Sequence, residues 1–122
     1  MHVRQPARRH PEQQVQHAVF EHLRWRGIAF AFHPANGGWR SPIEAKILKG
    51  SGVVSGVPDV IAICKGQVFA LKLKAPGGRL SPAQKNAHAR LRAAGAEVAT
   101  AVGLDAALQR LEAWNLLIGR AS

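Results

Sequence analysis

Four stretches of the chain have the pattern of apolar and polar residues that is typical of helices. Residues 12–26 carry apolar side chains every three or four positions, which places them on one helix face. Residues 41–49 and 81–94 each begin with Ser-Pro, a frequent N-cap followed by a frequent first helical residue. Residues 104–117 carry leucines at helical spacing. The pattern predicts four helices.

Shorter apolar runs between these helices predict four strands. Residues 28–33 form the first. The continuous apolar run at 60–64 is typical of a central strand that is buried on both faces. A tight turn at 65–67 joins it to a strand at 68–74, and the two form a hairpin. The helix that follows leads to a last strand at 97–102, which is expected to be parallel. This order predicts an α/β sandwich, a small mixed sheet flanked by helices.

A carboxylate and two lysines lie at matching ends of the predicted hairpin. Asp59 precedes its first strand, and Lys72 and Lys74 lie near the end of its second strand. Residues two apart on a strand point to the same side, so both lysines face one way. Neighbouring strands are about 4.8 Å apart, so Asp59 and the main-chain carbonyl of Leu73 can approach one Mg²⁺, which prefers oxygen ligands. The hairpin is therefore a candidate site for metal-assisted phosphodiester hydrolysis.

A further candidate acid lies on the first helix. Glu12 projects close to the centre of the apolar stripe, where an unpaired charge would be costly. We therefore treat it as a candidate site residue. An acid in the first turn is also favoured by the helix dipole, and that alternative stays open. Glu21 and Glu44 are interpreted as surface charges.

Five motifs in one order carry a resemblance to a known family. They are Glu12 in the first helix, Asn36-Gly37-Gly38 with Arg40, Gly56-Val57-Pro58-Asp59, the run from Leu71 to Gly78, and the run from Arg79 to Gln84. The segment from Glu12 to about Ala107 resembles the VRR-NUC (virus-type replication-repair nuclease) branch of the PD-(D/E)XK nucleases. The resemblance implies one nuclease domain over residues 12–118. It also implies Mg²⁺ or Mn²⁺, cleavage of branched DNA such as Holliday junctions in DNA repair, and a homodimer.

The same resemblance implies roles for individual residues. Asp59 matches the metal-binding acid, and Lys74 matches the lysine that orients or activates the attacking water. Glu12 matches the first-helix acid and Gln84 a supporting polar residue. Lys72 departs from the family, which has the glutamate of its Glu-x-Lys motif at this position. A lysine cannot bind Mg²⁺, and its charge repels the ion.

Three explanations for Lys72 compete: an engineered inactivating substitution, a degenerate nuclease kept as a binder, and another ligand in place of the glutamate. A change from Glu to Lys is one that would be chosen to abolish metal binding, which favours the first. We therefore expect a structure-specific DNA endonuclease that is inactive or impaired, or alternatively a non-catalytic DNA-binding module with the same fold. The Lys72 ammonium is expected to replace the cation, close to Asp59 and within reach of Glu12.

Composition favours a polyanionic partner. The 122 residues, enough for one domain, hold 17 Lys and Arg against 7 Asp and Glu, a formal net charge of +10. Nucleic acid is the favoured partner, although a solubility charge or a ribosomal-type basic surface would have a similar composition. The candidate DNA contacts lie in a flexible basic arm at residues 1–11, in loops and on the short helix: Arg8, Arg9, Asn36, Arg40, Lys46, Lys49 and Arg79.

Other residues have less specific interpretations. Cys64 is the only cysteine, so no intrachain disulfide can form, and it is predicted to be buried. The chain lacks a long apolar stretch and a signal-peptide core, so a cytoplasmic protein of bacterial or phage-like origin is expected. Trp25 and Trp114 are predicted to lie in the core or a dimer interface. His88 is more typical of a hydrogen-bonded core histidine than of a catalytic base, and His33 lacks the partner groups of a histidine-based nuclease.

Overall fold

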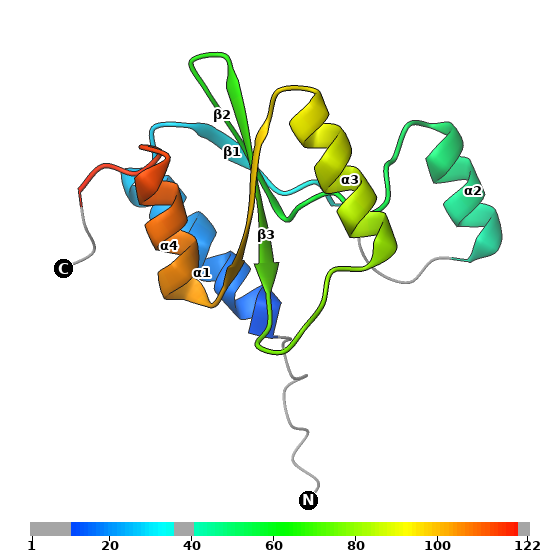
Figure 1. The fold of residues 1–122 in the computed structure, drawn as a ribbon, viewed down its shortest axis with the longest axis horizontal. Helices are drawn as coiled ribbons and strands as arrows, with labels where there is room; N and C mark the ends of the chain where they lie inside the picture. Colours follow the sequence, from blue (N-terminus) through cyan, green and yellow to red (C-terminus); the bar gives the residue numbers. More distant parts are fainter. Residues whose placement is uncertain (1–10, 36–40, 120–122) are drawn as a thin grey trace, which may run out of the picture.

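A four-stranded mixed sheet with helices on both sides forms the fold (Figure 1). The computed structural model describes residues 11–35 and 41–119. The strands are β1 (Phe30–Phe32), β2 (Val60–Cys64), β3 (Gln67–Lys74) and β4 (Glu97–Val102), and they lie in this order in the sheet. The first three are antiparallel neighbours, and β4 is parallel to β3. The predicted mixed sheet and its hairpin are therefore confirmed.

The described residues form four helices, as the sequence pattern predicts. They are α1 (Pro11–Arg26), α2 (Pro42–Gly50), α3 (Pro82–Ala93) and α4 (Leu104–Ala113). Two of them begin with serine N-caps, because the hydroxyls of Ser41 and Ser81 accept hydrogen bonds from main-chain N–H groups three residues later. None of the helices in the described ranges is long and apolar enough to cross a bilayer.

The last helix is shorter than the sequence pattern predicts. The pattern extends α4 to residue 117, whereas the helix ends at Ala113. Asn115 adopts a left-handed backbone conformation with φ of 60°, which asparagine tolerates better than most residues and which ends a helix. The chain can then turn back, so that Leu116 is buried in the core and Leu117 forms an antiparallel bridge with Gly27, the residue after α1.

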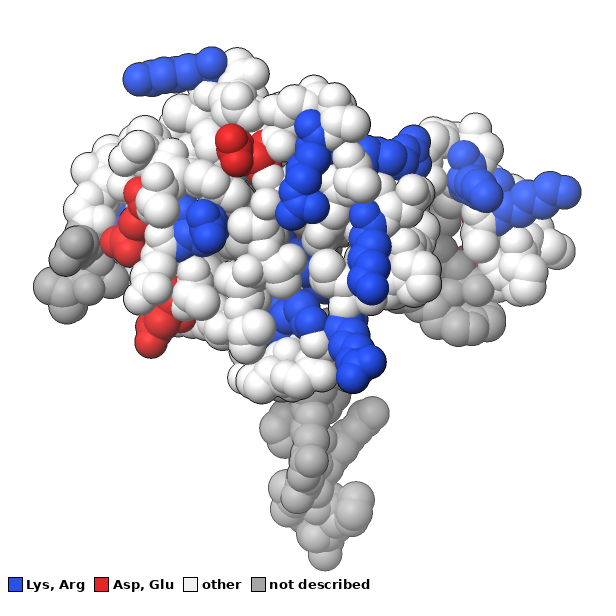
Figure 2. All heavy atoms as spheres, viewed as in Figure 1, with Lys and Arg blue, Asp and Glu red and all other residues white. Residues whose placement is uncertain are grey.

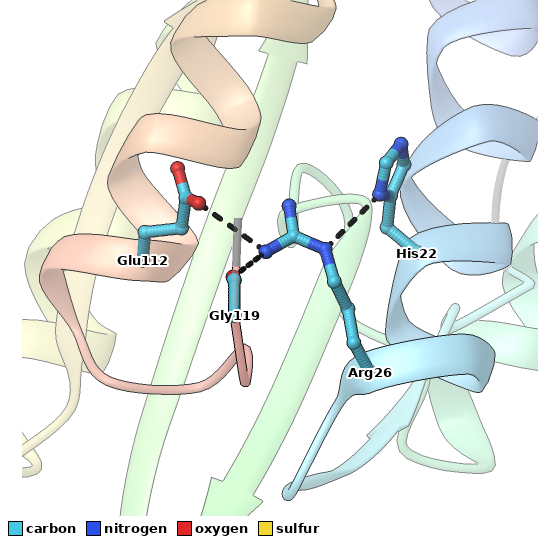
Figure 3. Close-up of polar contacts among 4 residues, drawn as sticks. All are labelled: His22, Arg26, Glu112 and Gly119. Carbon is cyan, nitrogen blue, oxygen red and sulfur yellow. Dashed lines mark hydrogen bonds and ion pairs between the residues drawn. The ribbon is translucent and has the colours of Figure 1, made fainter. Parts of the chain in front are cut away.

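Arg26, at the end of α1, forms hydrogen bonds with the C-terminal part of the described chain (Figure 3). Its guanidinium donates to the Glu112 carboxylate at 3.2 Å and to the Gly119 carbonyl, and its Nε donates to Nδ1 of His22 at 3.3 Å. The ion pair with Glu112 is partly buried. These contacts link the two helices that cover one side of the sheet.

Different helices cover the two faces of the sheet. Figure 1 shows α1 and α4 on one side of the sheet, α3 on the other, and α2 beyond α3. The hydrophobic core lies on the side of α1 and α4. It joins residues of α1, β2, β3, β4 and α4 and one residue after α4: Val19, Leu23, Val60, Ala62, Leu71, Leu73, Ala101, Ala107, Leu111 and Leu116. We call this the core face, and the opposite side the α3 face.

The prediction that β2 is buried on both faces is wrong. Val60 and Ala62 point to the core face and are buried, whereas Ile63 points to the α3 face and is 38% exposed. Cys64 is half-buried. The reason is that α3 packs along β4, which leaves the α3 face of β2 without a helix over it. The first strand is also shorter than the predicted range 28–33.

Candidate functional site

The start of β2 places a carboxylate beside a lysine of β3. Val60 pairs with Leu71, so one step further along the two strands Asp59 lies opposite Lys72. Oδ2 of Asp59 lies 3.4 Å from the Lys72 ammonium and accepts a hydrogen bond of 2.8 Å from the main-chain N–H of Leu73. Both charged side chains are mostly buried, with 16% and 20% of their surface exposed. The expected contact between Lys72 and Asp59 is therefore present.

A glycine holds the loop before Asp59 against α3. Gly56 has φ of 84°, in the left-handed region that favours glycine. A Cβ atom at this position would lie 2.5 Å from the main-chain carbonyl carbon and oxygen of Ala83 and 2.6 Å from the main-chain nitrogen of Gln84. The loop and the first turn of α3 thus approach each other backbone to backbone, and this contact helps to position Asp59.

His33 lies beside Asp59 and was not predicted to be part of the site. Its Nδ1 lies 2.7 Å from the main-chain carbonyl oxygen of Asp59. A carbonyl oxygen can only accept, so Nδ1 carries the proton and Nε2 of the neutral ring is left as an acceptor. The histidine follows β1 directly, and only the strand pairing brings it to residue 59. The sequence contains no motif that would have indicated this contact.

His88 is buried in α3 above the same part of the sheet. Its side chain is 2% exposed, and no described residue gives its Nε2 atom a hydrogen-bond partner. The prediction of a hydrogen-bonded core histidine is therefore wrong for this atom. Burial lowers the pKa of His88, and the charges of Arg92 and Lys72 lower it further, whereas Asp59 acts in the opposite direction. The imidazole is thus held in its neutral form next to the ion pair.

This histidine is expected to make the folded state less stable at acid pH. Below pH 6.5 the unfolded chain takes up a proton at His88, whereas the folded chain does so only at the lower pKa of the buried ring. The stabilisation is therefore complete above this pH and is lost as the pH falls through the window between the two pKa values. Denaturation at several pH values should show a shallower acid loss for His88→Gln than for the parent chain. His17→Gln, at an exposed position on α1, should leave the slope unchanged.

The other predicted site residues lie on three different elements. Lys74 is on the same face of β3 as Lys72 and is half-buried. The side chain of Gln84 is used in the capping box of α3, where its Oε1 accepts a hydrogen bond of 2.8 Å from Ser81 N. Glu12 is in the first turn of α1, which packs on the core face. Within the described residues no ion pair joins Glu12 to Lys72, and the expected reach of Lys72 to Glu12 stays a prediction.

Three of the candidate DNA contacts lie within the described residues and four lie outside them. Lys46 and Lys49 are exposed on α2, and Arg79 is exposed in the loop before α3. Figure 2 shows Lys and Arg side chains over α3 and α2, while the acidic side chains lie mainly towards α4. The remaining predicted contacts lie outside the described residues, and so does most of the predicted basic arm: Arg8, Arg9, Asn36 and Arg40.

Comparison with known proteins identifies the architecture. No family model matches the sequence, and no curated protein does. A solved structure described as a VRR_NUC domain protein is similar over 88% of this chain and 89% of its own, with 25% sequence identity and a TM-score of 0.69. The chain has the VRR-NUC fold. The resemblance inferred from the ordered motifs is thus confirmed at the level of the fold, which is a nuclease fold.

In this VRR-NUC fold the Lys72 ammonium lies beside Asp59, the residue that the sequence resemblance assigns as the metal-binding acid. The Asp59 oxygen nearest to it already accepts from Leu73 and faces the ammonium. Over residues 11–35 and 41–119, no cluster of three or more His, Cys, Asp or Glu side chains could hold a metal ion. An ammonium at 3.4 Å from the carboxylate would also repel a divalent cation. With Lys72 in place, these residues do not fit a Mg²⁺ or Mn²⁺ site.

Proposed function

We propose that this chain binds branched DNA through its nuclease fold, and that Lys72 blocks or impairs phosphodiester hydrolysis. The observation that carries the proposal is the ion pair between Lys72 and Asp59. The ammonium neutralises the carboxylate that the family resemblance assigns to the metal. It therefore removes the electrostatic penalty of an unpaired, mostly buried acid and at the same time repels the ion.

Two other features of the hairpin support the proposal. The N–H of Leu73 points towards Asp59, and in a strand the N–H and C=O of one residue point to the same side. The Leu73 carbonyl thus faces Asp59 as well, which supports its assignment as a potential metal ligand. Lys74 lies on the α3 face two residues after Lys72, where its amine can contact a phosphate or a water. In this proposal the departure from a working nuclease is concentrated at one side chain.

Cleavage assays on a labelled four-way junction test the proposal. The parent chain should bind the junction and leave it intact in Mg²⁺ or Mn²⁺. Cleavage by this chain at a normal rate would show that Lys72 does not block the site. The second candidate is a binding module that never cleaves. If it is correct, the Lys72→Glu variant should still bind the junction without cutting it.

DNA affinity is expected to fall steeply with salt. The net charge of +10 and the basic residues over α2 and α3 (Figure 2) favour contacts with phosphates, and each contact releases condensed counterions. The logarithm of the association constant should fall linearly with the logarithm of salt concentration, with a slope of about −0.9 per phosphate contacted. Fluorescence anisotropy on a junction across a salt series measures this slope. An affinity that is the same at low and physiological salt would contradict the assignment of DNA as the partner.

We also propose that the chain forms a homodimer, through the surface around Trp25. Trp114, the other predicted interface tryptophan, packs on Phe69 with ring centroids 5.2 Å apart and is therefore partly used within the chain. Trp25 is 89% exposed, so it is not a core residue, and Ile28 and Ile118 beside the paired chain ends are exposed as well. Apolar groups of this size are typical of interfaces. Light scattering should report a dimer for the parent chain and a monomer for Trp25→Ser.

A further inference from the structure

Two phenylalanines of β1 form an exposed aromatic strip on the α3 face. Phe30 is 70% exposed and Phe32 is 38% exposed, and their ring centroids lie 5.7 Å apart with planes tilted by 42°. Phe30 pairs with Ile63 and Phe32 with Ile61, so all four side chains point to the same face. The two rings do not stack face to face on each other. We call these four residues the aromatic strip.

The aromatic strip leads directly to the ion pair. Ile61 lies two residues after Asp59, so both side chains point to the same face of β2. The same face of β3 holds Ala70 opposite Ile61 and then Lys72. At the end of β1, His33 contacts the main chain of Asp59. A ligand that lies along the strip therefore reaches Asp59 and Lys72 without crossing another element of the sheet.

We propose that Phe30 and Phe32 stack on unpaired bases of DNA, so that the strip guides a single-stranded segment to the ion pair. This inference rests on the proposed DNA-binding function and adds to it the class of substrate, DNA with unpaired nucleotides. Aromatic side chains on a sheet, with cations nearby for the phosphates, are the usual means of binding single strands without sequence preference. Here Lys65 in the β2–β3 turn and Lys72 lie beyond the two ends of the strip.

A second copy of the chain fits the aromatic strip less well. β1 has three residues, which corresponds to about 10 Å of strand, so the strip offers only a few side chains. A stable protein interface buries about 800 Å² on each partner, far more than these four side chains supply. A nucleic acid strand, by contrast, is attracted by the net charge of +10. Area and charge thus both favour nucleic acid on this strip.

Matched ligands and variants test the stacking. Fluorescence anisotropy would compare a short oligothymidine, an abasic strand with the same number of phosphates, and a duplex of the same length. Phe30→Leu and Phe32→Leu remove the aromatic ring but keep an apolar side chain, whereas Phe30→Trp keeps a ring. Ile43→Ala, an exposed apolar position on α2, is the control. Thermal unfolding of each variant verifies that it is folded, which is expected because both rings are at the surface.

Each leucine variant should bind oligothymidine about tenfold more weakly, the effect of one lost base–aromatic stack. Its affinity for the abasic strand and the duplex should not change, and Phe30→Trp should bind as the parent does. Equal losses on all three ligands, or no loss on oligothymidine, would overturn the proposal. So would self-association that disappears in the leucine variants while oligothymidine affinity is kept, because the strip would then be a protein interface. If the parent chain bound a four-way junction at low salt but not oligothymidine, only this proposal would fail, whereas a chain that bound neither would contradict the proposed DNA-binding function itself.

Discussion

Lys72→Glu is expected to convert a chain that does not cut DNA into one that cuts branched DNA in Mg²⁺ or Mn²⁺. The new carboxylate would stand opposite Asp59 in the register that now holds the ion pair, beside the Leu73 carbonyl. Two carboxylates and a carbonyl are a suitable ligand set for these ions. A bound ion provides several kcal/mol of transition-state stabilisation, which corresponds to a rate increase on the order of a thousandfold.

The same variant should also show a change that does not depend on cleavage. Without metal, two facing carboxylates replace an attraction with a repulsion, and the variant should lose on the order of 2 kcal/mol of unfolding free energy. A metal at a hundred times its dissociation constant restores about 2.7 kcal/mol. Mn²⁺ should therefore raise the melting temperature of Lys72→Glu and leave that of the parent chain unchanged.

Two further variants separate the causes. Lys72→Gln removes the charge without supplying a carboxylate, and it should neither bind Mn²⁺ tightly nor cut. Asp59→Ala added to Lys72→Glu should abolish both the thermal shift and the cleavage. If Lys72→Glu gained the thermal shift but did not cut, the metal site would be restored in a chain that lacks another catalytic group. If it gained neither, the degenerate binding module would be the better description.

Gly56→Ala is expected to cost about 2–4 kcal/mol of unfolding free energy. The left-handed backbone at this position costs a non-glycine residue about 1 kcal/mol. The new Cβ would also lie 2.5 Å from main-chain atoms of Ala83, and a backbone neighbour cannot move aside as a flexible side chain can. Overpacking of this kind adds about 1–3 kcal/mol. Chemical denaturation measures the loss.

Gly66→Ala is the matched control for this prediction. Gly66 lies in the β2–β3 turn with φ of 79° and has no atom within 4 Å of its potential Cβ. It therefore has the backbone strain of Gly56 without the close approach, and its loss should be about 1 kcal/mol. Equal losses for the two variants would mean that the contact between the loop and α3 contributes nothing to stability. In the Lys72→Glu chain, Gly56→Ala should also reduce cleavage, because Asp59 follows the same loop.

Local chemistry explains the parts of the fold that the sequence predicted. Ser41 and Ser81 cap helices through hydrogen bonds that close within three residues, so neighbours in sequence are sufficient to predict them. The same holds for the β2–β3 hairpin, whose short turn determines its register. That register then places Asp59 opposite Lys72, and the ion pair follows from the spacing of the two residues along the hairpin.

The sequence did not predict the contacts between segments that lie far apart in the chain. The apolar run of β2 does not indicate which of its faces a helix covers, and the position of α3 over β4 left Ile63 exposed. The same packing leaves the ring of Phe30 exposed. The alternation of side chains along β1 does not by itself indicate that no helix covers this face. His33 reaches Asp59, and Gly56 meets Ala83, only because separate strands and helices dock together.

The sequence by itself thus determined the helix starts, the β2–β3 hairpin and the pairing of Asp59 with Lys72, because each depends on interactions within one helix or one hairpin. Only the tertiary structure decided which face of the sheet is open and which side chains surround the ion pair. Those features depend on how α3 and the core-face helices share the two sides of the sheet. That choice is made by summed packing over many weak contacts between segments far apart in the chain, which no short motif encodes.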